Sequence, residues 1–401
     1  MSEMSYLEKL LDGVEVEWLP LGEVSALRRG RVMSKGYLTE NFGPYPVYSS
    51  QTANNGKIGS INTFDFDGEY ISWTTDGANA GTVFYRTGKF SITNVCGLIT
   101  LKNKYPLIYK FLFYWLTIEA KKHVYSGMGN PKLMSHQVEN IPVPVPCPDN
   151  PEKSLAIQSE IVRILDKFTA LTAELTAELN MRKKQYNYYR DQLLSFKEGE
   201  VEWKTLGEIG KWYGGGTPSK NKIEFWENGS IPWISPKDMG RTLVDSSEDY
   251  ITEEAVLQSS TKLIPANSIA IVVRSSILDK VLPSALIKVP ATLNQDMKAV
   301  IPHENILVKY IYHMIGSRGS DILRAAKKTG GSVASIDSKK LFSFKIPVPN
   351  INEQQRIVEI LDKFDTLTNS ITEGLPREIE LRQKQYEYYR DLLFSFPKPE
   401  T

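Results

Sequence analysis

Two separate segments of this chain carry an apolar stripe whose members alternate at spacings of three and four residues. The first stripe runs from Ile161 to Leu193 and the second from Ile357 to Leu375. Residues at this spacing lie on one side of an α-helix and form the seam of a coiled coil. We therefore expect two long helices that pair as an antiparallel coiled coil; the alternative is that each helix buries its stripe on its own domain. The seam positions of the first segment are Ile161, Leu165, Phe168, Leu175, Leu179, Tyr186, Tyr189 and Leu193, with Thr172 and Arg182 as polar interruptions, and those of the second are Ile357, Leu361, Phe364, Ile371 and Leu375.

Both striped segments are copies of one sequence. Residues 182–196 return as residues 382–396 with 11 of 15 positions identical, and residues 158–172 return as residues 354–368 with 10 of 15 identical. Similarity of this length at a fixed period marks an internal repeat. The sequences between the copies diverge almost completely. This pattern predicts two different recognition modules on a common helical frame.

The spacing inside the two copies differs by one helical turn. Leu171 and Arg182 are 11 residues apart, whereas Leu367 and Arg382 are 15 apart. A four-residue insertion unwinds a coiled coil locally without turning its seam away. Gly374 lies at this point in the second copy together with Pro376, and we expect a kink or break there. The first copy instead has two Thr-Ala-Glu-Leu tetrads over residues 172–179, which predict stiff helix.

The divergent regions show shorter periodic patterns. β-branched runs such as Ile269–Val273 predict strands, and helices are expected near Leu107–Thr117 and Leu307–Ile315. Each region closes on Ile-Pro-Val-Pro, at residues 141–144 and 346–349, where alternate prolines impose extended backbone. We expect an α+β protein with a pseudo-twofold repeat: two mixed α/β domains at residues 1–151 and 198–350, with helical spacers at residues 152–197 and 351–401.

Composition adds few constraints. The chain has 401 residues, 41% of them hydrophobic, which fits two globular domains. Cys96 and Cys147 are its only cysteines, so no disulfide framework is implied and a reducing cytoplasm fits best. No secretion signal is apparent, and no apolar run approaches the ~20 residues that span a bilayer. Trp18 and Trp203 recur at matching positions, and we expect both to be core anchors.

The chain offers little catalytic chemistry. Gly214–Lys220 only superficially resembles a phosphate-binding loop, and Asp76–Gly81 is interpreted as a tight turn rather than a nucleotide loop. The four histidines are scattered, and neither a His-Glu-x-x-His motif nor a motif of closely spaced paired cysteines is present to hold a metal. The net charge is only +1, but basic residues gather at residues 28–35 and 303–345, as suits local phosphate contact. We therefore expect no reaction to be catalysed by this chain itself.

The order of these parts carries a resemblance. Glu15-Val16-Glu17-Trp18 and Glu200-Val201-Glu202-Trp203 open the two halves, Ile-Pro-Val-Pro closes each variable region, and Ile-Val-x-Ile-Leu-Asp-Lys-Phe helices ending in Tyr-x-Tyr-Tyr-Arg-Asp follow. This duplicated order resembles the specificity subunit of type I restriction–modification systems. Gly215-Gly216-Thr217-Pro218, followed by Ile231–Ser235 and Asp238, also resembles a pattern of its target recognition domains. The first half departs from that pattern and has Pro44–Tyr48 instead.

The resemblance implies a function. Each variable region is expected to read one half of an asymmetric, bipartite target in double-stranded DNA, without membrane involvement. The repeated helices are expected to set the half-site spacing and to dock two modification subunits, which methylate adenine. Restriction and translocase subunits would complete an ATP-dependent nuclease. No cofactor is expected in this chain, because S-adenosylmethionine, ATP and magnesium would belong to the partner subunits.

Base reading needs long polar side chains in a DNA groove, and phosphate contacts position the domain. The candidate DNA-binding residues are Arg28, Arg29, Arg31, Lys35, Asn54, Asn55, Lys57 and Lys132 in the first half, and Thr217, Ser219, Lys220, Lys222, Lys237, Arg241, Arg274, Ser275, Lys327 and Lys328 in the second. The repeated tyrosines cover more than one helix face and are candidates for the partner interface. They are Tyr186, Tyr188, Tyr189, Tyr386, Tyr388 and Tyr389.

Two alternatives remain open from the sequence. A self-contained DNA methyltransferase or nuclease would need a cofactor loop or an acidic metal cluster, which the motifs do not supply. A duplicated scaffold that binds only proteins would account for the helices but not for the large, divergent inserts.

Overall fold

A computed structural model describes residues 10, 13–127, 129–328, 333–370 and 372–397, and the chain forms two compact units. Unit 1 takes its residues from the ranges 1–172 and 381–401, and unit 2 comprises residues 173–380. The divisions fall inside the long helices. Each unit therefore contains one mixed α/β domain together with segments from both copies of the helical repeat.

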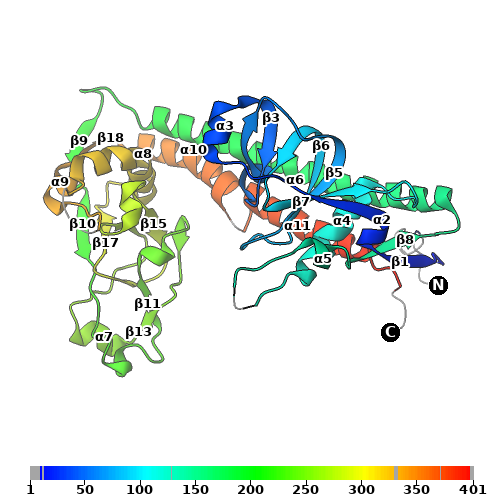
Figure 1. Cartoon of the computed structure of the whole chain (residues 1–401). Helices are drawn as coiled ribbons and strands as arrows, with labels where there is room; N and C mark the ends of the chain where they lie inside the picture. The colour runs from blue at the N-terminus through cyan, green and yellow to red at the C-terminus, as the bar shows by residue number, and fades with distance from the viewer. Residues whose placement is uncertain (1–9, 11–12, 128, 329–332, 371, 398–401) are drawn as a thin grey trace, which may run out of the picture. The chain divides into compact units, whose positions relative to one another are not determined.

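A six-stranded sheet in the order β2-β7-β5-β6-β3-β4 forms the centre of unit 1 (Figure 1). Its pairs are antiparallel except for β3 with β6. One face of the sheet packs with helix α4 (Tyr109–Glu119), and the other covers a smaller apolar cluster around Phe90 and Leu98. The strands are β2 (Ser25–Arg29), β3 (Phe42–Tyr48), β4 (Lys57–Ile61), β5 (Phe66–Thr74), β6 (Val83–Ile92) and β7 (Cys96–Leu101). The short helices of this unit are α2 (Leu21–Val24) before β2, α3 (Lys35–Glu40) and η1 (Ala53–Gly56) between the strands, and η2 (Ala120–His123) and α5 (Ser135–Val138) after β7.

Unit 2 contains a five-stranded sheet in the order β10-β17-β14-β15-β12 and a three-stranded sheet in the order β13-β11-β16. Its strands are β10 (Gly210–Gly214), β11 (Ile231–Ile234), β12 (Leu243–Val244), β13 (Tyr250–Ile251), β14 (Ser268–Val272), β15 (Ser284–Ile287), β16 (Thr292–Leu293) and β17 (Met297–Pro302). The helices are η3 (Ile223–Phe225), η4 (Pro236–Asp238), α7 (Glu253–Gln258), η5 (Ser276–Asp279), α8 (Val308–Ala326) and α9 (Ser338–Ser343).

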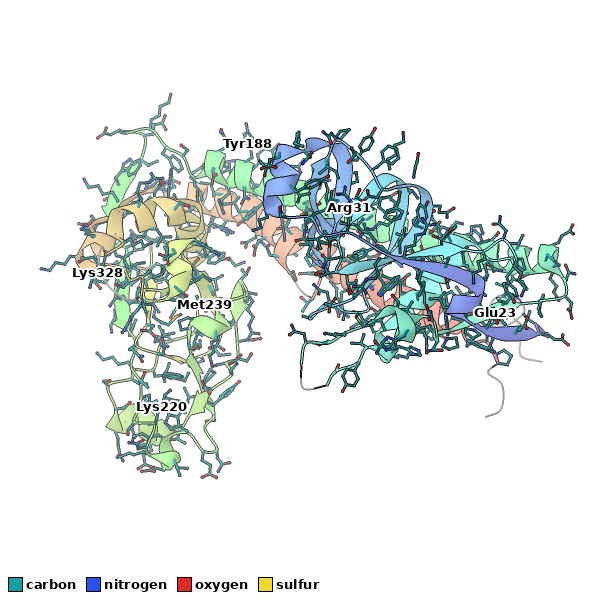
Figure 2. The ribbon with its side chains drawn as sticks, viewed as in Figure 1. Glu23, Arg31, Tyr188, Lys220, Met239 and Lys328 are labelled. Carbon is teal, nitrogen blue, oxygen red and sulfur yellow. The ribbon has the colours of Figure 1, made fainter. Side chains whose placement is uncertain are left out.

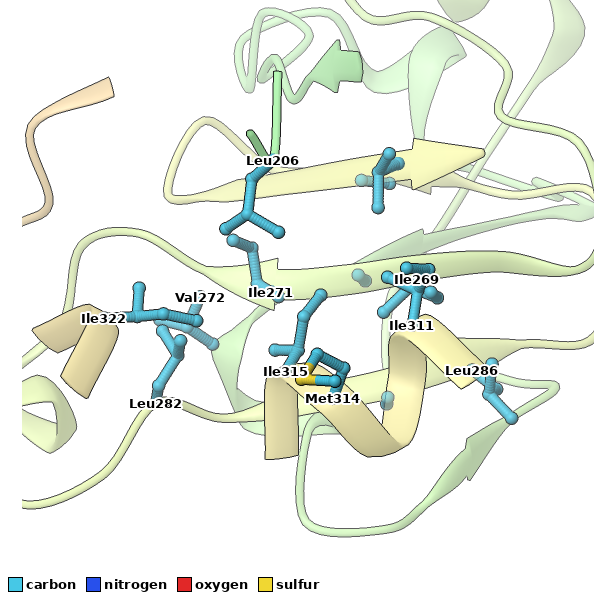
Figure 3. Close-up of a cluster of buried hydrophobic side chains, with 14 of the residues drawn as sticks. Leu206, Ile269, Ile271, Val272, Leu282, Leu286, Ile311, Met314, Ile315 and Ile322 are labelled. Carbon is cyan, nitrogen blue, oxygen red and sulfur yellow. The ribbon is translucent and has the colours of Figure 1, made fainter. Parts of the chain in front are cut away.

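The core of unit 2 follows from the apolar spacing of α8. Ile311 and Ile315 lie four residues apart on one helix face and point at β14, where Ile269 and Ile271 meet them (Figure 3). All four side chains are almost fully buried. Burying an aliphatic side chain of this size contributes about 1.5–3 kcal/mol. The predicted strand at residues 269–273 and both predicted helices, now α4 and α8, are confirmed.

Each variable region begins and ends in a small two-stranded sheet of its own. β1 (Val16–Pro20) pairs with β8 (Pro142–Pro146), and β9 (Glu202–Thr205) pairs with β18 (Lys345–Val348), both antiparallel. The Ile-Pro-Val-Pro segments therefore adopt extended edge strands, as predicted, because a proline cannot donate to a further strand. These sheets bring the start and end of each variable region together next to the helix that follows.

The repeated helices begin on the same asparagine signal. The side chain of Asn150 accepts a hydrogen bond from the Lys153 backbone at the start of α6 (Pro151–Leu193), and Asn350 accepts one from Glu353 at the start of α10 (Ile351–Asn369). Asparagine at this position satisfies a backbone N–H that has no partner inside the helix. The α6 helix runs unbroken for 43 residues through both tetrads, as predicted.

The second copy is interrupted where the sequence predicts a break. The α10 helix ends at Asn369 and α11 (Gly374–Leu393) begins at Gly374, whose φ is +79°. Glycine adopts this left-handed backbone without a steric penalty. A Cβ there would lie 2.5 Å from the carbonyl oxygen of Thr366. The predicted seam residue Ile371 lies outside the described residues.

The two copies pair within each unit. In unit 1 the ring of Phe168 on α6 stacks on Tyr389 of α11 with centroids 5.4 Å apart, and in unit 2 Phe364 of α10 stacks on Tyr189 of α6 at 5.7 Å. The paired helices run in opposite directions (Figure 1). The same stripes also pack on the domains, since Ile161 and Leu165 join the core of unit 1 and Ile357 and Leu361 that of unit 2. The predicted antiparallel pairing is confirmed. The alternative, in which each helix buries its stripe on its own domain, is also observed for these stripe residues.

The end of each copy completes the core of the other copy's domain. Phe394 and Phe396, at the end of the chain's second copy, lie in the unit 1 core, where Phe394 packs 5.2 Å from Phe111. Leu194, at the end of the first copy, is fully buried in the unit 2 core. The last residues of the two copies are therefore exchanged between the two domains. The sequence pattern did not predict this exchange.

The two repeated tryptophans differ in burial. Trp18 packs edge-on against Trp115 at 5.4 Å and donates its indole N–H to the carbonyl oxygen of Pro397, as expected of a core anchor. Trp203 is 38% exposed, so the prediction was wrong for this residue. It lines a surface pocket with Arg318, Arg324 and other α8 residues.

Candidate nucleic-acid interface

Loops at one end of the unit 1 sheet are held together by main-chain hydrogen bonds. We call this set, Arg29–Arg31, Thr75–Gly77, Thr93–Val95 and Pro131–Leu133, the unit 1 rim. The amide of Gly30 donates to the carbonyl of Cys96 over 3.2 Å, and that of Thr75 donates to the carbonyl of Val95 over 3.0 Å. The amide of Leu133 donates to the carbonyl of Thr75, which ties the last loop to the end of β5.

The unit 2 sheet ends in a matching set of loops. We call Gly215–Thr217, Val273–Ser275, Asn294–Asp296 and Ala334–Ile336 the unit 2 rim. The amide of Gly215 donates to Met297 O over 3.2 Å, that of Val273 to Asp296 O over 2.8 Å, and that of Ile336 to Val273 O over 2.9 Å. These three bonds correspond to the bonds that Gly30, Thr75 and Leu133 donate in the unit 1 rim. They lie at equivalent strand ends. The two rims therefore share one backbone frame.

A glycine is required at the same point of both frames. A Cβ on Gly30 would lie 2.2 Å from Ile92 O, and one on Gly215 would lie 1.6 Å from Asn294 O. Real Cβ atoms do not approach a carbonyl oxygen that closely, so only glycine allows the first loop to cross the turn before β7 or β17. The Gly-Gly-Thr-Pro pattern identified this loop in the second half alone. Its counterpart, Gly30 within a run of arginines, has no such pattern and was missed.

The side chains on the shared frame differ. Asp76 follows Thr75 in unit 1 and accepts a 2.5 Å hydrogen bond from the Thr75 hydroxyl. Arg274 follows Val273 in unit 2, with 59% of its side chain exposed and its guanidinium 3.9 Å from Asp296. Equivalent positions therefore present a carboxylate in one rim and a guanidinium in the other. Residues 77–80 form the expected tight turn, closed by a bond from Ala80 N to Gly77 O.

The predicted basic residues of unit 1 fall mostly at or beside its rim. The guanidinium of Arg29 donates to Thr75 Oγ1 and Asn94 O, which crosslinks three rim loops. Arg31 pairs with Asp65 at 2.9 Å and bonds Tyr37, and these contacts raise the pKa of its guanidinium. Lys132 makes the bridge between the loop of Asp76 and Tyr125. Arg28 and Lys35 are exposed on β2 and α3, while Asn54, Asn55 and Lys57 belong to the turn from β3 to β4.

The predicted residues of unit 2 divide into separate groups. Thr217, Arg274 and Ser275 lie in the rim, and Lys328 is joined to it through a backbone bond to Ser335 O. Lys327 lies beside them and pairs with Asp279 at 2.6 Å. Ser219, Lys220 and Lys222 lie near η3 instead, and Figure 2 shows Lys220 far from Lys328.

Two further cations of unit 2 face acidic neighbours. Lys237 lies 3.7 Å from Glu248, and Arg241 lies 3.4 Å from Asp245 and bonds Ser246. Residue type alone does not distinguish among these cations, because it does not reveal which carboxylates fold beside them. The structure does not bring Lys237 and Arg241 into the rim.

The repeated tyrosines face different surroundings. Tyr186 is buried and its hydroxyl lies 3.2 Å from His313 Nδ1, and Tyr386 is half-buried beside Tyr114. Tyr188 and Tyr388 are 62% and 65% exposed. Tyr189 and its counterpart Tyr389 stack on the seam phenylalanines. The tyrosines that offer most surface to another molecule are therefore Tyr188, which is labelled in Figure 2, and Tyr388.

An aspartate on each repeated helix fastens the helix to its domain. In unit 1 Asp166 accepts from Lys110 Nζ at 2.6 Å and from the Tyr114 hydroxyl at 2.7 Å. We call these three residues the unit 1 clamp. Burial and the bond to Asp166 both raise the pKa of the Tyr114 hydroxyl. The helix–domain junction of unit 1 is thus held by an ion pair and a phenol.

The unit 2 clamp consists of Lys309, His313 and Asp362. Asp362 accepts from Lys309 and lies 3.0 Å from His313 Nε2, while the other ring nitrogen of His313 faces the hydroxyl of Tyr186. Burial raises the pKa of Asp362, but the bonds from His313 and Lys309 outweigh it and leave the pKa below its ordinary value. A histidine thus occupies the place that Tyr114 has in unit 1.

Among the described residues, no group of three or more His, Cys, Asp or Glu side chains is placed to hold a metal ion. Within the same ranges, every helix is too short or too polar to cross a bilayer.

Comparison with known proteins agrees with this duplicated architecture. A family model for the type I restriction modification DNA specificity domain matches twice, over residues 13–182 and 198–381. The chain is 71% identical to the Escherichia coli type I restriction enzyme EcoR124I/EcoR124II specificity subunit, over all of this chain and 99% of that protein. It is 39% identical to the Escherichia coli EcoprrI specificity subunit over 93% of each chain. In fold it is similar to the type I restriction–modification S subunit of M. genitalium, with a TM-score of 0.60, 18% identity, and 99% and 100% of the two chains covered. The chain therefore belongs to the type I restriction–modification DNA specificity family.

Proposed function

We propose that the two rims are DNA-reading surfaces and that each reads one half of an asymmetric, bipartite target in double-stranded DNA. The observation that supports this most directly is one backbone frame with Asp76 in one rim and Arg274 in the other. Carboxylates accept hydrogen bonds from cytosine, and arginine donates two to guanine. Two rims with such different chemistry are expected to read different sequences.

The repeated helices are proposed to dock two modification subunits, one on each half of the repeat. Tyr188 and Tyr388 support this, because both are exposed aromatic residues on equivalent faces. Exposed tyrosines often anchor protein interfaces. The double variant Tyr188→Ala/Tyr388→Ala should weaken binding of the modification subunit, with Leu257→Ala, an exposed apolar residue elsewhere, as control. Binding is measured by analytical ultracentrifugation of the chain with its modification subunit. Unchanged binding of the double variant would contradict this role for the two tyrosines.

Chemistry is proposed to reside in the partner subunits. The modification subunits would methylate adenine with S-adenosylmethionine, and restriction subunits would add ATP- and magnesium-dependent cleavage. The described part of this chain offers no metal cluster of its own, and its duplicated form suits two copies of a modification subunit.

The tetrad tract in α6 is proposed to set the distance between half-sites. One further Thr-Ala-Glu-Leu unit would lengthen the helix by about 6 Å and rotate its end by roughly 40°. Since DNA rises about 3.4 Å per base pair, the unread gap should widen by about one or two base pairs. Methylation of DNA with graded gaps would reveal the change, and an altered half-site sequence would contradict it.

One binding experiment separates this function from the alternatives. The chain is purified with and without its modification subunit, and binding to a library of duplexes is measured at one stated salt concentration, because phosphate binding falls steeply with salt. Sequence-dependent binding by the complex is the expected result. A duplicated protein scaffold would show none, and a self-contained enzyme would modify or cleave DNA without a partner.

A further inference from the structure

An arginine is buried inside the unit 1 sheet, beneath a loop that carries two candidate reading residues. Arg86, in the middle of β6, is only 3% exposed. Arginine is rarely buried to this extent unless it is paired. Its Nε donates to the Ser72 hydroxyl on β5 at 3.0 Å, and one terminal nitrogen donates to the carbonyl oxygen of Asn55 at 2.8 Å.

Aromatic rings and neutral oxygens surround this guanidinium. Its central carbon lies 3.6 Å from the ring centroid of Tyr48 and 4.4 Å from that of Phe84. None of the ion pairs found among the described residues includes Arg86. Burial lowers its pKa to about 10, so it remains charged at neutral pH. A buried charge is costly unless its surroundings compensate for it. Here the compensation comes from the two rings, the Ser72 hydroxyl and the Asn55 carbonyl.

The loop above Arg86 has an unusual backbone. Asn54, Asn55 and Gly56 follow one another with φ of +50°, +53° and +80°. Consecutive left-handed residues are unfavourable for side chains other than glycine, and they persist only where surrounding contacts fix them. Those contacts are a bond from Ser49 N to Gly56 O at 2.9 Å, one from the Gln51 amide to Lys57 O at 2.6 Å, and the bond from Arg86 to Asn55 O.

The loop is also connected to the rim. The side-chain amide of Asn79, just beyond the rim turn, donates to Ser50 O at 3.0 Å, and Thr93 of the rim bonds Ser49. The side chains of Asn54 and Asn55 are exposed at the tip. An asparagine amide can donate and accept at once, which matches the major-groove edge of adenine. Fixing the backbone of such a base reader before DNA arrives reduces the ordering cost of binding and so favours affinity.

We propose that Arg86 is a positioning residue for DNA specificity: from inside the sheet it fixes the left-handed turn at residues 54–56, so that Asn54 and Asn55 are presented to base edges. This inference rests on the proposed function of the unit 1 rim and adds the loop and its buried support to it. Arg86 itself touches no DNA in this account. Its effect on recognition passes through the Asn55 carbonyl.

The test uses the full chain assembled with its modification subunits and compares four variants. Arg86→Met removes the guanidinium with little loss of volume, and Arg86→Lys keeps the charge without the paired donors. Asn54→Gly/Asn55→Gly removes both amides, while glycine keeps the left-handed backbone. Asn267→Gly is the matched control, because Asn267 is an exposed asparagine with φ of +63° in unit 2.

Binding to a cognate duplex and to a random duplex is measured by fluorescence anisotropy over a range of salt. Arg86→Met and the glycine pair should both lose cognate affinity by about tenfold or more, the value of one good base contact, with random-duplex affinity little changed. Arg86→Lys should lie between them and the wild type, and Asn267→Gly should match the wild type. The salt dependence should be unchanged in Arg86→Met, because loss of a phosphate contact would lower the slope by about one.

The remaining outcomes each contradict a defined step. If the wild-type complex distinguishes no sequence, the proposed function fails before Arg86 is tested. If the glycine pair loses discrimination and Arg86→Met does not, the loop reads DNA without this support. If Arg86→Met alone loses discrimination, Arg86 acts by another route. A general loss of folding in Arg86→Met, detected by its unfolding temperature, leaves Arg86→Lys and the glycine pair as the deciding variants, and wild-type discrimination in both would overturn the proposal.

Discussion

Asp76 in unit 1 and Arg274 in unit 2 both follow the third strand of their sheets, and equivalent main-chain hydrogen bonds hold both. The two rims share their main-chain hydrogen bonds and the glycine at residue 30 or 215. The side chains differ, since a carboxylate stands where the other rim has a guanidinium. The shared backbone therefore tolerates different side chains on its surface, because main-chain hydrogen bonds hold it in place.

The clamps extend this comparison to the helices. Asp166 and Asp362 each fasten a repeated helix to the domain before it, but Tyr114 completes one clamp and His313 the other. Gln158 and Gln354 are alike in both units, where each accepts from the backbone at the start of α4 or α8 over 2.9 Å. Repeated residues therefore make the fixed contacts, and non-repeated residues adapt to them.

The largest expected effect comes from removing the exchanged ends of the repeat. Phe394→Ala should destabilise unit 1 by about 3–5 kcal/mol and Leu194→Ala should destabilise unit 2 by about 2–5 kcal/mol, because each leaves a cavity in a closed core. Chemical denaturation, followed by hydrogen exchange in each unit, measures both. Tyr388→Ala, close by but exposed, is the control. The exchange would be contradicted if Phe394→Ala lowered the stability of unit 2 alone, or if Leu194→Ala lowered the stability of unit 1 alone.

The shared glycine should have the next largest effect. Gly30→Ala and Gly215→Ala each place a Cβ against a main-chain carbonyl, and forcing it in should cost about 1–3 kcal/mol. Gly129→Ala and Gly240→Ala have nothing within 4 Å of the new Cβ and are the controls for the two units. Thermal unfolding compares all four. Equal stability of Gly30→Ala and Gly129→Ala would show that the first rim does not share the frame of the second.

Exchanging the chemistry of one rim should alter recognition without altering stability. Arg274→Ala should weaken binding of the assembled complex to its target by about 1–3 kcal/mol and relax the choice of base at one position. Arg324→Ala is the control, because Arg324 is an exposed arginine on α8 outside the rim. Competition binding against single-base variants measures the difference. Equal effects of the two substitutions would remove Arg274 from the reading surface.

The smallest expected effect is an acid dependence of the unit 2 clamp. Its bonds hold the pKa of Asp362 below the ordinary value of 3.8, so the folded state binds fewer protons there than the unfolded state. The stabilisation is complete above pH 3.8 and is lost as the pH falls below 3.8 through the lowered pKa. Because the pair is partly exposed, its contribution should be about 1 kcal/mol or less. Asp362→Asn should flatten this part of the acid unfolding curve, and an unchanged curve would contradict the assignment.

The helical frame was accessible from sequence because its signals are local. The stripe from Ile161 and the break at Gly374 each depend on residues within a few turns of the chain. The exchange of Phe394 and Leu194 was not accessible, since pairing between distant helices leaves no mark on the spacing of either one. The seam pattern predicts which helix residues are buried, but it does not predict in which domain they are buried.

The candidate interface was predicted only in part. Residue type selected Arg29, Arg274 and Lys132, which the structure places in the rims, and it selected Lys237 equally, although Glu248 lies beside that residue. Arg86 was missed because a basic residue between polar neighbours on an alternating strand predicts an exposed position. Only the folded sheet shows that Tyr48 and Phe84 enclose it. The chemistry of the rims could be listed from sequence, whereas its arrangement required the structure.

We propose that the two rims read separate halves of one target. The most direct test is to assemble the chain with its modification subunits, methylate a random DNA library, and map every methylated adenine for the wild type and for Arg274→Ala. We expect a two-part methylated motif with an unread gap, in which Arg274→Ala relaxes the sequence of one half and leaves the other half unchanged. A continuous motif, or a substitution in one rim that alters both halves, would contradict it.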